Sequence, residues 1–248
     1  MNTLKSLGAF ALIGAMLGAH ALAHASVVIS GTRVIFPAQE REVTVKITNE
    51  GNTPALIQTW LDKGDEKESP EKIDVPFTLT PSMFRMEPGK GQTLRLIYTK
   101  EALPAEKESL FWLNVLEIPP KAAGGDDRNK LQIAFRSRIK VMFRPEGLSG
   151  SAAAAPKQVK WELVRDHGKY ALKATNPTPY VVNLGGIALK SGDRKYDARM
   201  GFVRPGDTQL FPIEGLPTAP VAGAKVDFSA IDDWGASHDD EQPVSFRE

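Results

Sequence analysis

The sequence predicts an all-β protein made of two β-sandwich domains. Hydrophobic residues recur with period two in many short segments, and turn-forming residues separate these segments at near-regular intervals. The chain has 248 residues, which is long for one sandwich and sufficient for two. Its 42% hydrophobic and 25% charged residues are typical of a globular protein.

The first 25 residues have the pattern of a secretory signal peptide. Lys5 precedes an apolar run over residues 7–22, and Ala23-His24-Ala25 forms an A-x-A cleavage site. The run is short for a membrane span. We therefore expect residues 1–25 to be removed, the mature chain to begin near Ser26, and the protein to be exported without membrane insertion.

The first half of the mature chain alternates as half-buried strands do. Val43, Val45 and Ile47 share one parity, and the turn residues 49–52 follow them. The other strands predicted here cover residues 55–61, 94–98, 110–118 and 131–143. Between them we expect a charged surface loop at 62–74, a helical turn at 101–106 and a flexible connection at 121–130.

A domain boundary is predicted in the segment 144–156, which is rich in proline, glycine and alanine. It divides the chain into an N-terminal domain at 26–147 and a C-terminal domain at 148–248. Strands are predicted in the second domain at residues 159–164, 170–175, 180–189, 208–213 and 225–231. The polar tail 235–248 is expected to be ragged or disordered.

Residues for metal, cofactor or catalytic chemistry are scarce. The chain has no cysteine, and residues 26–248 hold only His167 and His238, without a second ligand at metal-binding spacing. No nucleophile elbow, phosphate-binding loop or dinucleotide fingerprint occurs. Basic and acidic residues balance once Lys5 is removed, so nothing favours nucleic acid. We expect no metal, no cofactor and no enzymatic activity.

One predicted strand allows two interpretations. Leu131, Ile133 and Phe135 share one parity, while Arg136, Arg138 and Lys140 share the other. The three apolar side chains could cover the core of their own sandwich. They could also belong to a sheet-edge strand that is offered to a partner by β-augmentation. Periodicity alone does not separate these alternatives.

Four segments resemble, in the same order, the PapD-like periplasmic chaperones of the chaperone–usher pathway. They are Gly31-Thr32-Arg33-Val34-Ile35-Phe36-Pro37, residues 110–120 (Leu-Phe-Trp-Leu-Asn-Val-Leu-Glu-Ile-Pro-Pro), residues 131–145, and Ile231-Asp232-Asp233-Trp234-Gly235, in which Asp232 replaces the common asparagine. The resemblance implies two immunoglobulin-like sandwiches joined at an angle into an L with a central cleft. It also implies a periplasmic protein that holds pilus (fimbrial) subunits by donor-strand complementation and delivers them to an outer-membrane usher.

The resemblance assigns a role to eight residues. Arg33 and Lys140 would anchor the C-terminal carboxylate of a pilus subunit, although a pair of solvated strand cations is the alternative. Leu131, Ile133 and Phe135 would form the donated apolar row. Glu117, Arg144 and Asp233 would fix the angle between the domains.

Other interpretations stay open from the sequence. An exported structural or adhesive module, such as a pilin or adhesin, would show a similar strand pattern, and an exported hydrolase is the remote third possibility. An exposed apolar strand would also favour a self-capping homodimer. The short connection after Pro119-Pro120 resembles that of the short-loop subclass, which serves rod-like pili with complex tips.

Overall fold

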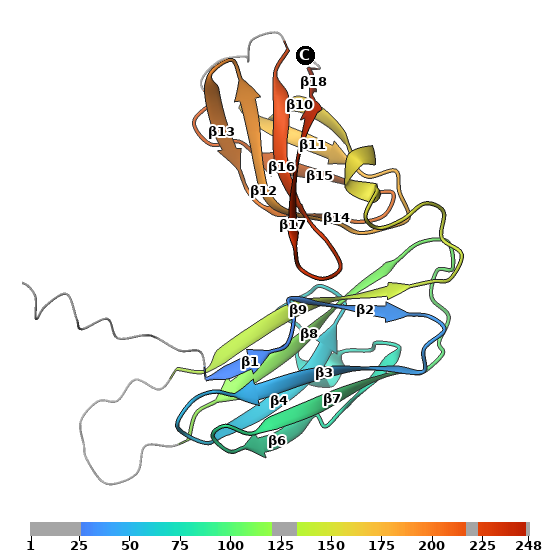
Figure 1. Cartoon of the computed structure of the whole chain (residues 1–248), viewed down its shortest axis with the longest axis vertical. Coiled ribbons are helices and arrows are strands. Elements are labelled where there is room, and N and C mark those ends of the chain that lie inside the picture. Colours follow the sequence, from blue (N-terminus) through green and yellow to red (C-terminus); the bar gives the residue numbers. More distant parts are fainter. Residues whose placement is uncertain (1–25, 121–132, 217–222, 247–248) are drawn as a thin grey trace, which may run out of the picture.

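The computed structural model describes residues 26–120, 133–216 and 223–246. Two β-sandwiches lie at an angle to one another, as Figure 1 shows, and this confirms the predicted fold class. The predicted signal peptide, Leu131 and the connection at 121–130 lie outside the described residues. Within the described part of the chain, no helix has the length and apolar character needed to cross a bilayer.

The first domain is a sandwich of two sheets that enclose a core containing Phe36, Ile47, Leu94, Leu113 and Val141. One sheet has the order β1-β3-β7-β5, and the other has the order β2-β9-β8-β4-β6. The strands are β1 (Val27–Ile29), β2 (Arg33–Pro37), β3 (Glu42–Asn49), β4 (Ala55–Asp62), β5 (Phe77–Thr80), β6 (Met83–Met86), β7 (Gly91–Tyr98), β8 (Ser109–Ile118) and β9 (Phe135–Arg144), with the 3-10 turn η1 at Pro70–Lys72.

The two halves of β9 have different neighbours. Along its length β9 pairs antiparallel with β8, from Phe135 opposite Glu117 to Phe143 opposite Ser109. On its other side β9 pairs with β2, in parallel, only from Lys140 to Arg144. Among the described residues, the half from Phe135 to Ile139 therefore has one free edge.

The second domain repeats the sandwich around a core that includes Trp161, Leu172, Leu189 and Phe228. One sheet has the order β15-β11-β10-β18, and the other has the order β13-β12-β16-β17, with β14 also paired to β12. The elements are η2 (Ala155–Gln158), β10 (Lys160–Asp166), β11 (Lys169–Thr175), β12 (Val182–Ser191), β13 (Arg194–Ala198), β14 (Gly201–Val203), β15 (Thr208–Pro212), β16 (Lys225–Ile231), β17 (Ser237–Pro243) and β18 (Ser245–Phe246).

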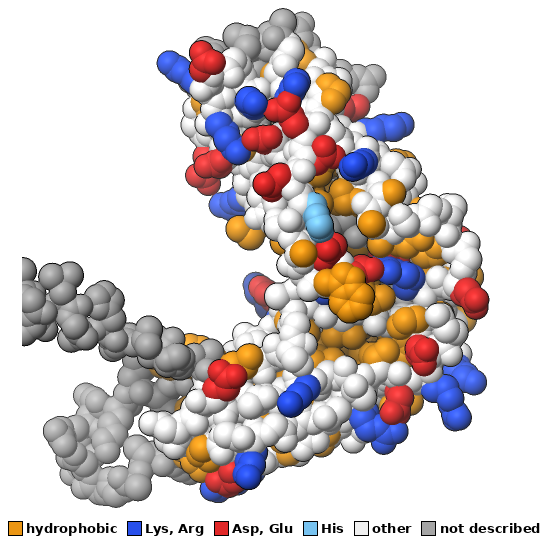
Figure 2. Space-filling view, in the orientation of Figure 1, with side chains coloured by type: hydrophobic (Ala, Val, Ile, Leu, Met, Phe, Trp, Pro, Cys, Tyr) orange, Lys and Arg blue, Asp and Glu red, His pale blue; other side chains and the backbone are white. Residues whose placement is uncertain are grey.

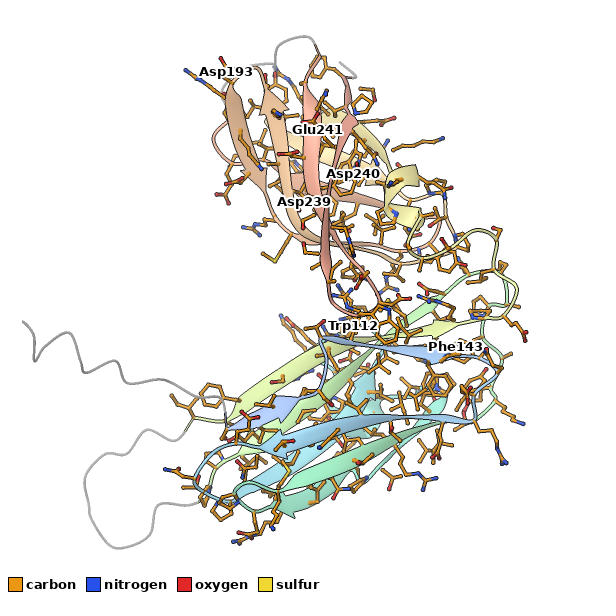
Figure 3. All side chains as sticks on the ribbon, in the orientation of Figure 1. Trp112, Phe143, Asp193, Asp239, Asp240 and Glu241 are labelled. Atoms are coloured by element: carbon orange, nitrogen blue, oxygen red, sulfur yellow. The ribbon has the colours of Figure 1, made fainter. Side chains whose placement is uncertain are left out.

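The prediction of a ragged tail after residue 235 was wrong. β17 pairs along its length with β16, and β18 pairs with β10. The acidic residues Asp239, Asp240 and Glu241 follow one another along β17 in Figure 3. In addition to this backbone pairing, Glu241 forms ion pairs with Lys190 on β12 and Lys225 on β16. Cross-strand ion pairs of this kind are invisible to a hydropathy pattern.

The helical turn predicted at 101–106 was also wrong, because this segment has no helix in the structure. Pro104 lies inside it and has no backbone N–H to donate. The segment is fixed locally instead: the Tyr98 hydroxyl donates to the Glu101 carbonyl, and Thr99 Oγ1 donates to the Glu101 carboxylate over 3.1 Å.

Candidate functional site

The two domains meet through a small apolar cluster. Leu110, Trp112 and Met142 from the first domain are buried together with Val181 from the second. Ile35 and Phe202 pack against this cluster, and the Trp112 and Phe202 rings form an edge contact with centroids 5.8 Å apart. Trp112 lies on the side of the first sandwich that faces the second domain (Figure 3).

A charged cluster lies beside the apolar one. The Arg144 guanidinium donates to Glu108 over 2.6 Å and to both carboxylate oxygens of Asp233, over 2.7 and 2.9 Å. The second oxygen of Glu108 accepts the backbone N–H of Val181 over 2.6 Å. One guanidinium and one carboxylate of the first domain therefore each bind the second domain directly.

Burial and pairing act in opposite directions on these groups. Burial raises the pKa of Glu108, against the effects of the Val181 N–H and of Arg144. Burial also acts to lower the pKa of Arg144, but its bonds to Asp233 and Glu108 prevail and raise it. Arg144 consequently stays charged at any physiological pH, and it compensates the buried Glu108.

Glu117 does not belong to this cluster, so its predicted role in orienting the domains was wrong. Glu108 immediately precedes β8, whereas Glu117 lies near the other end of that strand. Nine strand residues span roughly 30 Å, which separates the two carboxylates along the sheet. The Glu117 carboxylate instead accepts a hydrogen bond from the Ser26 hydroxyl. Both residues are glutamates at the margins of one strand, and the sequence offers no signal that distinguishes them.

Arg33 and Lys140 lie side by side at the base of the angle between the domains. They are register partners in the parallel pairing of β2 with β9. Arg33 Nη1 donates to the Ile231 carbonyl over 3.1 Å, and Lys140 Nζ donates to Asn183 Oδ1 over 2.7 Å. Each cation of the first domain therefore reaches a neutral oxygen of the second.

Neither of these cations forms an ion pair within the described part of the chain. Burial lowers the pKa of Lys140 to about 8, and the neighbouring Arg33 acts in the same direction. Burial likewise lowers the pKa of Arg33, although Asp232 and Asp233 act at longer range to raise it. Two partly buried cations without a bound carboxylate have a strong electrostatic preference for an anion.

The predicted donor residues that the structure describes are exposed. Ile133 is 51% exposed and Phe135 is 63% exposed. Phe135 has the same parity as Val141 and Phe143, which are buried in the core. The apolar row that covers the core in the second half of β9 therefore continues past the sandwich in the first half. Leu131 lies outside the described residues.

The opposite face of β9 carries an ordered row of cations. Arg138 pairs with the fully buried Asp62, and Arg136 donates through Nε to Asn114 Oδ1 over 2.9 Å. The guanidinium of Arg138 also lies 4.6 Å from the Trp112 ring centroid. Sequence reasoning missed Asp62, which it placed at the start of an exposed loop, because nothing local indicates its partner 76 residues away.

The space between the domains opens as a wide notch in the space-filling view of Figure 2. A hollow at the hinge side is lined by residues of the second domain, among them Val181, Asn183, Asp232, Asp233 and Trp234. Trp234 is 93% exposed and follows the end of β16. Asn183 and Ile231, which also line this hollow, are the second-domain residues that Lys140 and Arg33 contact.

Comparison with known families gives a match to each domain. Residues 26–149 match the family described as "Pili and flagellar-assembly chaperone, PapD N-terminal domain". Residues 154–242 match "Pili assembly chaperone PapD, C-terminal domain". The two matches together include most of the chain and follow the order of the two sandwiches.

Individual proteins are similar over most of their length. The chain is 42% identical over 216 residues to "Probable fimbrial chaperone YadV" of Escherichia coli (strain K12), covering 86% of this chain and 87% of that one. It is 41% identical over 237 residues to "Chaperone protein FimB/FhaD" of Bordetella pertussis, covering 93% of each.

Solved structures are similar as well. The crystal structure of the YadV chaperone superposes with a TM-score of 0.77 at 39% identity, covering 88% of this chain and all of that one. The SafB chaperone of Salmonella enterica, solved in complex with the SafA pilin, superposes with a TM-score of 0.72 at 26% identity, covering 90% of this chain and 98% of that one.

Proposed function

The chain belongs to the PapD-like family of pilus-assembly chaperones, and we propose that it works in the periplasm by binding pilus subunits and delivering them to an outer-membrane usher. Family membership favours this function over an exported structural or adhesive module. The SafB structure, in which a relative holds a pilin, supports the class of partner. A chaperone of this family needs no catalytic centre, which agrees with the absence of enzyme motifs from the sequence.

The single observation that carries the proposal is the uncompensated cation pair at Arg33 and Lys140. A peptide carboxylate placed between them would accept charge-assisted hydrogen bonds from both, in a partly dry site that strengthens such bonds. Arg33 can form a planar bidentate grip, whereas Lys140 acts as a point charge. Asn183 and Ile231 hold the two side chains through neutral acceptors, so both positive charges stay available to the bound pilin.

The free half of β9 supplies the second part of the proposed mechanism. A pilin that lacks one strand has an open groove and unpaired strand edges, which are an aggregation hazard. The half of β9 that begins at Phe135 offers backbone hydrogen bonds along one edge, and Ile133 and Phe135 offer apolar side chains. Each large apolar side chain contributes roughly 1.5–3 kcal/mol when fully buried. The pilin that follows in the fibre can later replace this donated strand without a nucleotide cofactor.

We assign the interdomain role to Arg144, Asp233 and Glu108. Their bonds join β9, the residue before β8 and the loop after β16, so they set the angle at which the cation pair faces the notch. The contribution of such a cluster is geometric more than energetic, because desolvation offsets much of the attraction within a buried ion pair.

The anchor is tested by producing the chaperone together with a pilin and purifying the complex. Lys140→Ala or Arg33→Ala should abolish recovery of the pilin, because the carboxylate loses one of two charged donors. Lys160→Ala is the matched control, since Lys160 is an exposed strand lysine on β10 of the second domain. Circular dichroism should show both anchor variants folded. Normal recovery of the complex with both variants would refute the anchor.

A further inference from the structure

Ser26, the first described residue, is held tightly by its surroundings. Its carbonyl accepts the backbone N–H groups of Glu50 and Gly51, over 2.6 and 3.2 Å. A Cβ on Gly51 would lie only 2.6 Å from the Ser26 Cβ, so only glycine permits this close approach. The Ser26 hydroxyl donates to Glu117 Oε1. The backbone and the side chain of Ser26 are thus fixed before β1 begins.

Glu117 is a carboxylate without a cation. It accepts the hydroxyl of Ser26 and the backbone N–H of Val27, so donors from two successive residues converge on it. No lysine, arginine or histidine in the described ranges forms an ion pair with it. Burial raises its pKa, and the Val27 N–H only partly opposes this effect. A half-buried carboxylate in this position lacks the positive partner that usually offsets its desolvation.

The backbone nitrogen of Ser26 can supply the missing charge. Within one serine residue the backbone nitrogen lies within about 4 Å of Oγ in every rotamer. Because Oγ is hydrogen-bonded to Glu117 Oε1, the backbone nitrogen of Ser26 lies no more than about 7 Å from that oxygen. We propose that Glu117 is the binding site for the α-ammonium group that forms when the chain is cleaved before Ser26. This inference rests on the signal-peptide cleavage predicted from the sequence and is independent of pilin binding.

The proposed pair lies next to the donor half of β9. Glu117 is the register partner of Phe135, the first residue of β9. β1, which begins one residue after Ser26, pairs with β3 in the opposite sheet. An ion pair between Ser26 and Glu117 therefore ties the two sheets together at the point where the donor half begins. In the uncleaved precursor an uncharged amide occupies this position, so cleavage itself completes the site.

The test measures the coupling between the α-amino group and Glu117 in the full processed protein. The mass of the exported protein first establishes its N-terminal residue. The α-amino group is then acetylated, which removes its charge, or reductively dimethylated, which keeps it. All samples carry Lys140→Arg, because the lowered pKa of Lys140 would make it compete for the reagent. The readouts are the unfolding equilibrium constant and the hydrogen-exchange rates of the β1 amides.

Acetylation should raise the unfolding equilibrium constant and the β1 exchange rates about 2–5-fold, which is the range for a partly exposed ion pair. Dimethylation should leave both unchanged. In Glu117→Gln, acetylation should have no effect, whereas in the matched control Glu106→Gln, at an exposed glutamate, the full effect should persist. An equal effect of acetylation with and without Glu117, or a processed chain that begins at another residue, would overturn the proposal and leave the chaperone function untouched.

Discussion

The two halves of β9 share one backbone and one alternation of side chains, yet their surroundings differ. From Lys140 to Arg144 the strand has a neighbour on each side, and Val141 and Phe143 fill the core. From Phe135 to Ile139 it has a neighbour only at β8 in the described structure, and Phe135 lies mostly in solvent. One half belongs to the fold, and the other half is the part that we propose as the donor strand.

Under the proposed function, this difference lets a single strand combine stability with recognition. The fixed half positions Lys140 and Arg144, whose side chains reach the second domain through Asn183 and Asp233. The free half then projects from that fixed point in a defined direction and register. A pilin anchored at Lys140 would therefore pair with the free edge in only one register. Successive residues of β9 face opposite sides of the sheet, so a shift by one residue would turn every side chain to the wrong side.

The largest expected effect comes from one substitution made in each half. Phe143→Ala should lower the free energy of unfolding by about 3–5 kcal/mol, since Phe143 is buried among other aromatic rings. Phe135→Ala should change it by less than about 0.5 kcal/mol, because the ring is already exposed. Urea denaturation measures both values. A large loss of stability in Phe135→Ala would show that both halves serve the core.

The charged cluster at the end of the fixed half should give the next largest effect. Arg144→Met leaves Glu108 and Asp233 without their cation, and we expect a loss of about 2 kcal/mol, below the value for a fully buried pair because Arg144 keeps some exposure. Arg95→Met is the control, since its pair with Glu42 is exposed and should have little effect on stability. Thermal or urea unfolding measures both variants. Equal losses of unfolding free energy in Arg144→Met and Arg95→Met would show that the partly buried cluster contributes no more than the exposed pair.

The pKa of Lys140 predicts the smallest effect, which concerns pH. Only the protonated amine attracts a carboxylate, so affinity for a peptide with the C-terminal sequence of a pilin should fall about 10-fold between pH 7 and pH 9 as Lys140 loses its proton near pH 8. Lys140→Arg should remove this dependence, because arginine stays charged. Titration calorimetry at several pH values gives the comparison. An unchanged affinity across this range would exclude Lys140 as a charge donor to the ligand.

The stability of the free protein should show the opposite pH trend. The folded-state pKa of Lys140, about 8, lies below the ordinary lysine value of 10.5, so burial of the charged amine costs stability at low pH. That cost disappears as the pH rises from about 8 to 10.5, where the unfolded chain binds more protons than the folded one. A peptide affinity that falls while the free energy of unfolding rises over the same pH range would link Lys140 to both properties.

Much of the fold was predictable because it depends on local alternation. The strands expected at 43–48, 55–61, 94–98 and 110–118 correspond to β3, β4, β7 and β8. One strand that the pattern missed, β17, is an edge strand whose Glu241 forms cross-strand ion pairs with Lys190 and Lys225. Its side chains are polar on both faces, so no period-two hydropathy signal exists for it.

The site was less predictable, because its partners come from distant parts of the chain. Family resemblance placed Arg33 next to Lys140 and Arg144 next to Asp233, which the structure brings together. It chose Glu117 where the structure uses Glu108, since both glutamates flank the same apolar run. Three residues of the second domain that contribute to the interface look like ordinary strand residues in sequence: Val181, Asn183 and Phe202. They contribute to the interface only because the angle between the domains brings them against the first domain.

The parallel pairing of β2 with β9 determines when, during folding, the proposed anchor site for a pilin can form. Arg33 and Lys140 are remote in sequence, so their encounter closes a very long loop and comes late in folding. A nascent chain emerges N-terminus first, and its anchor site stays incomplete until β9 has followed. A chain that lacks β9 therefore has neither the complete cation pair nor the proposed donor strand, and it cannot bind a pilin in the proposed way until β9 has folded.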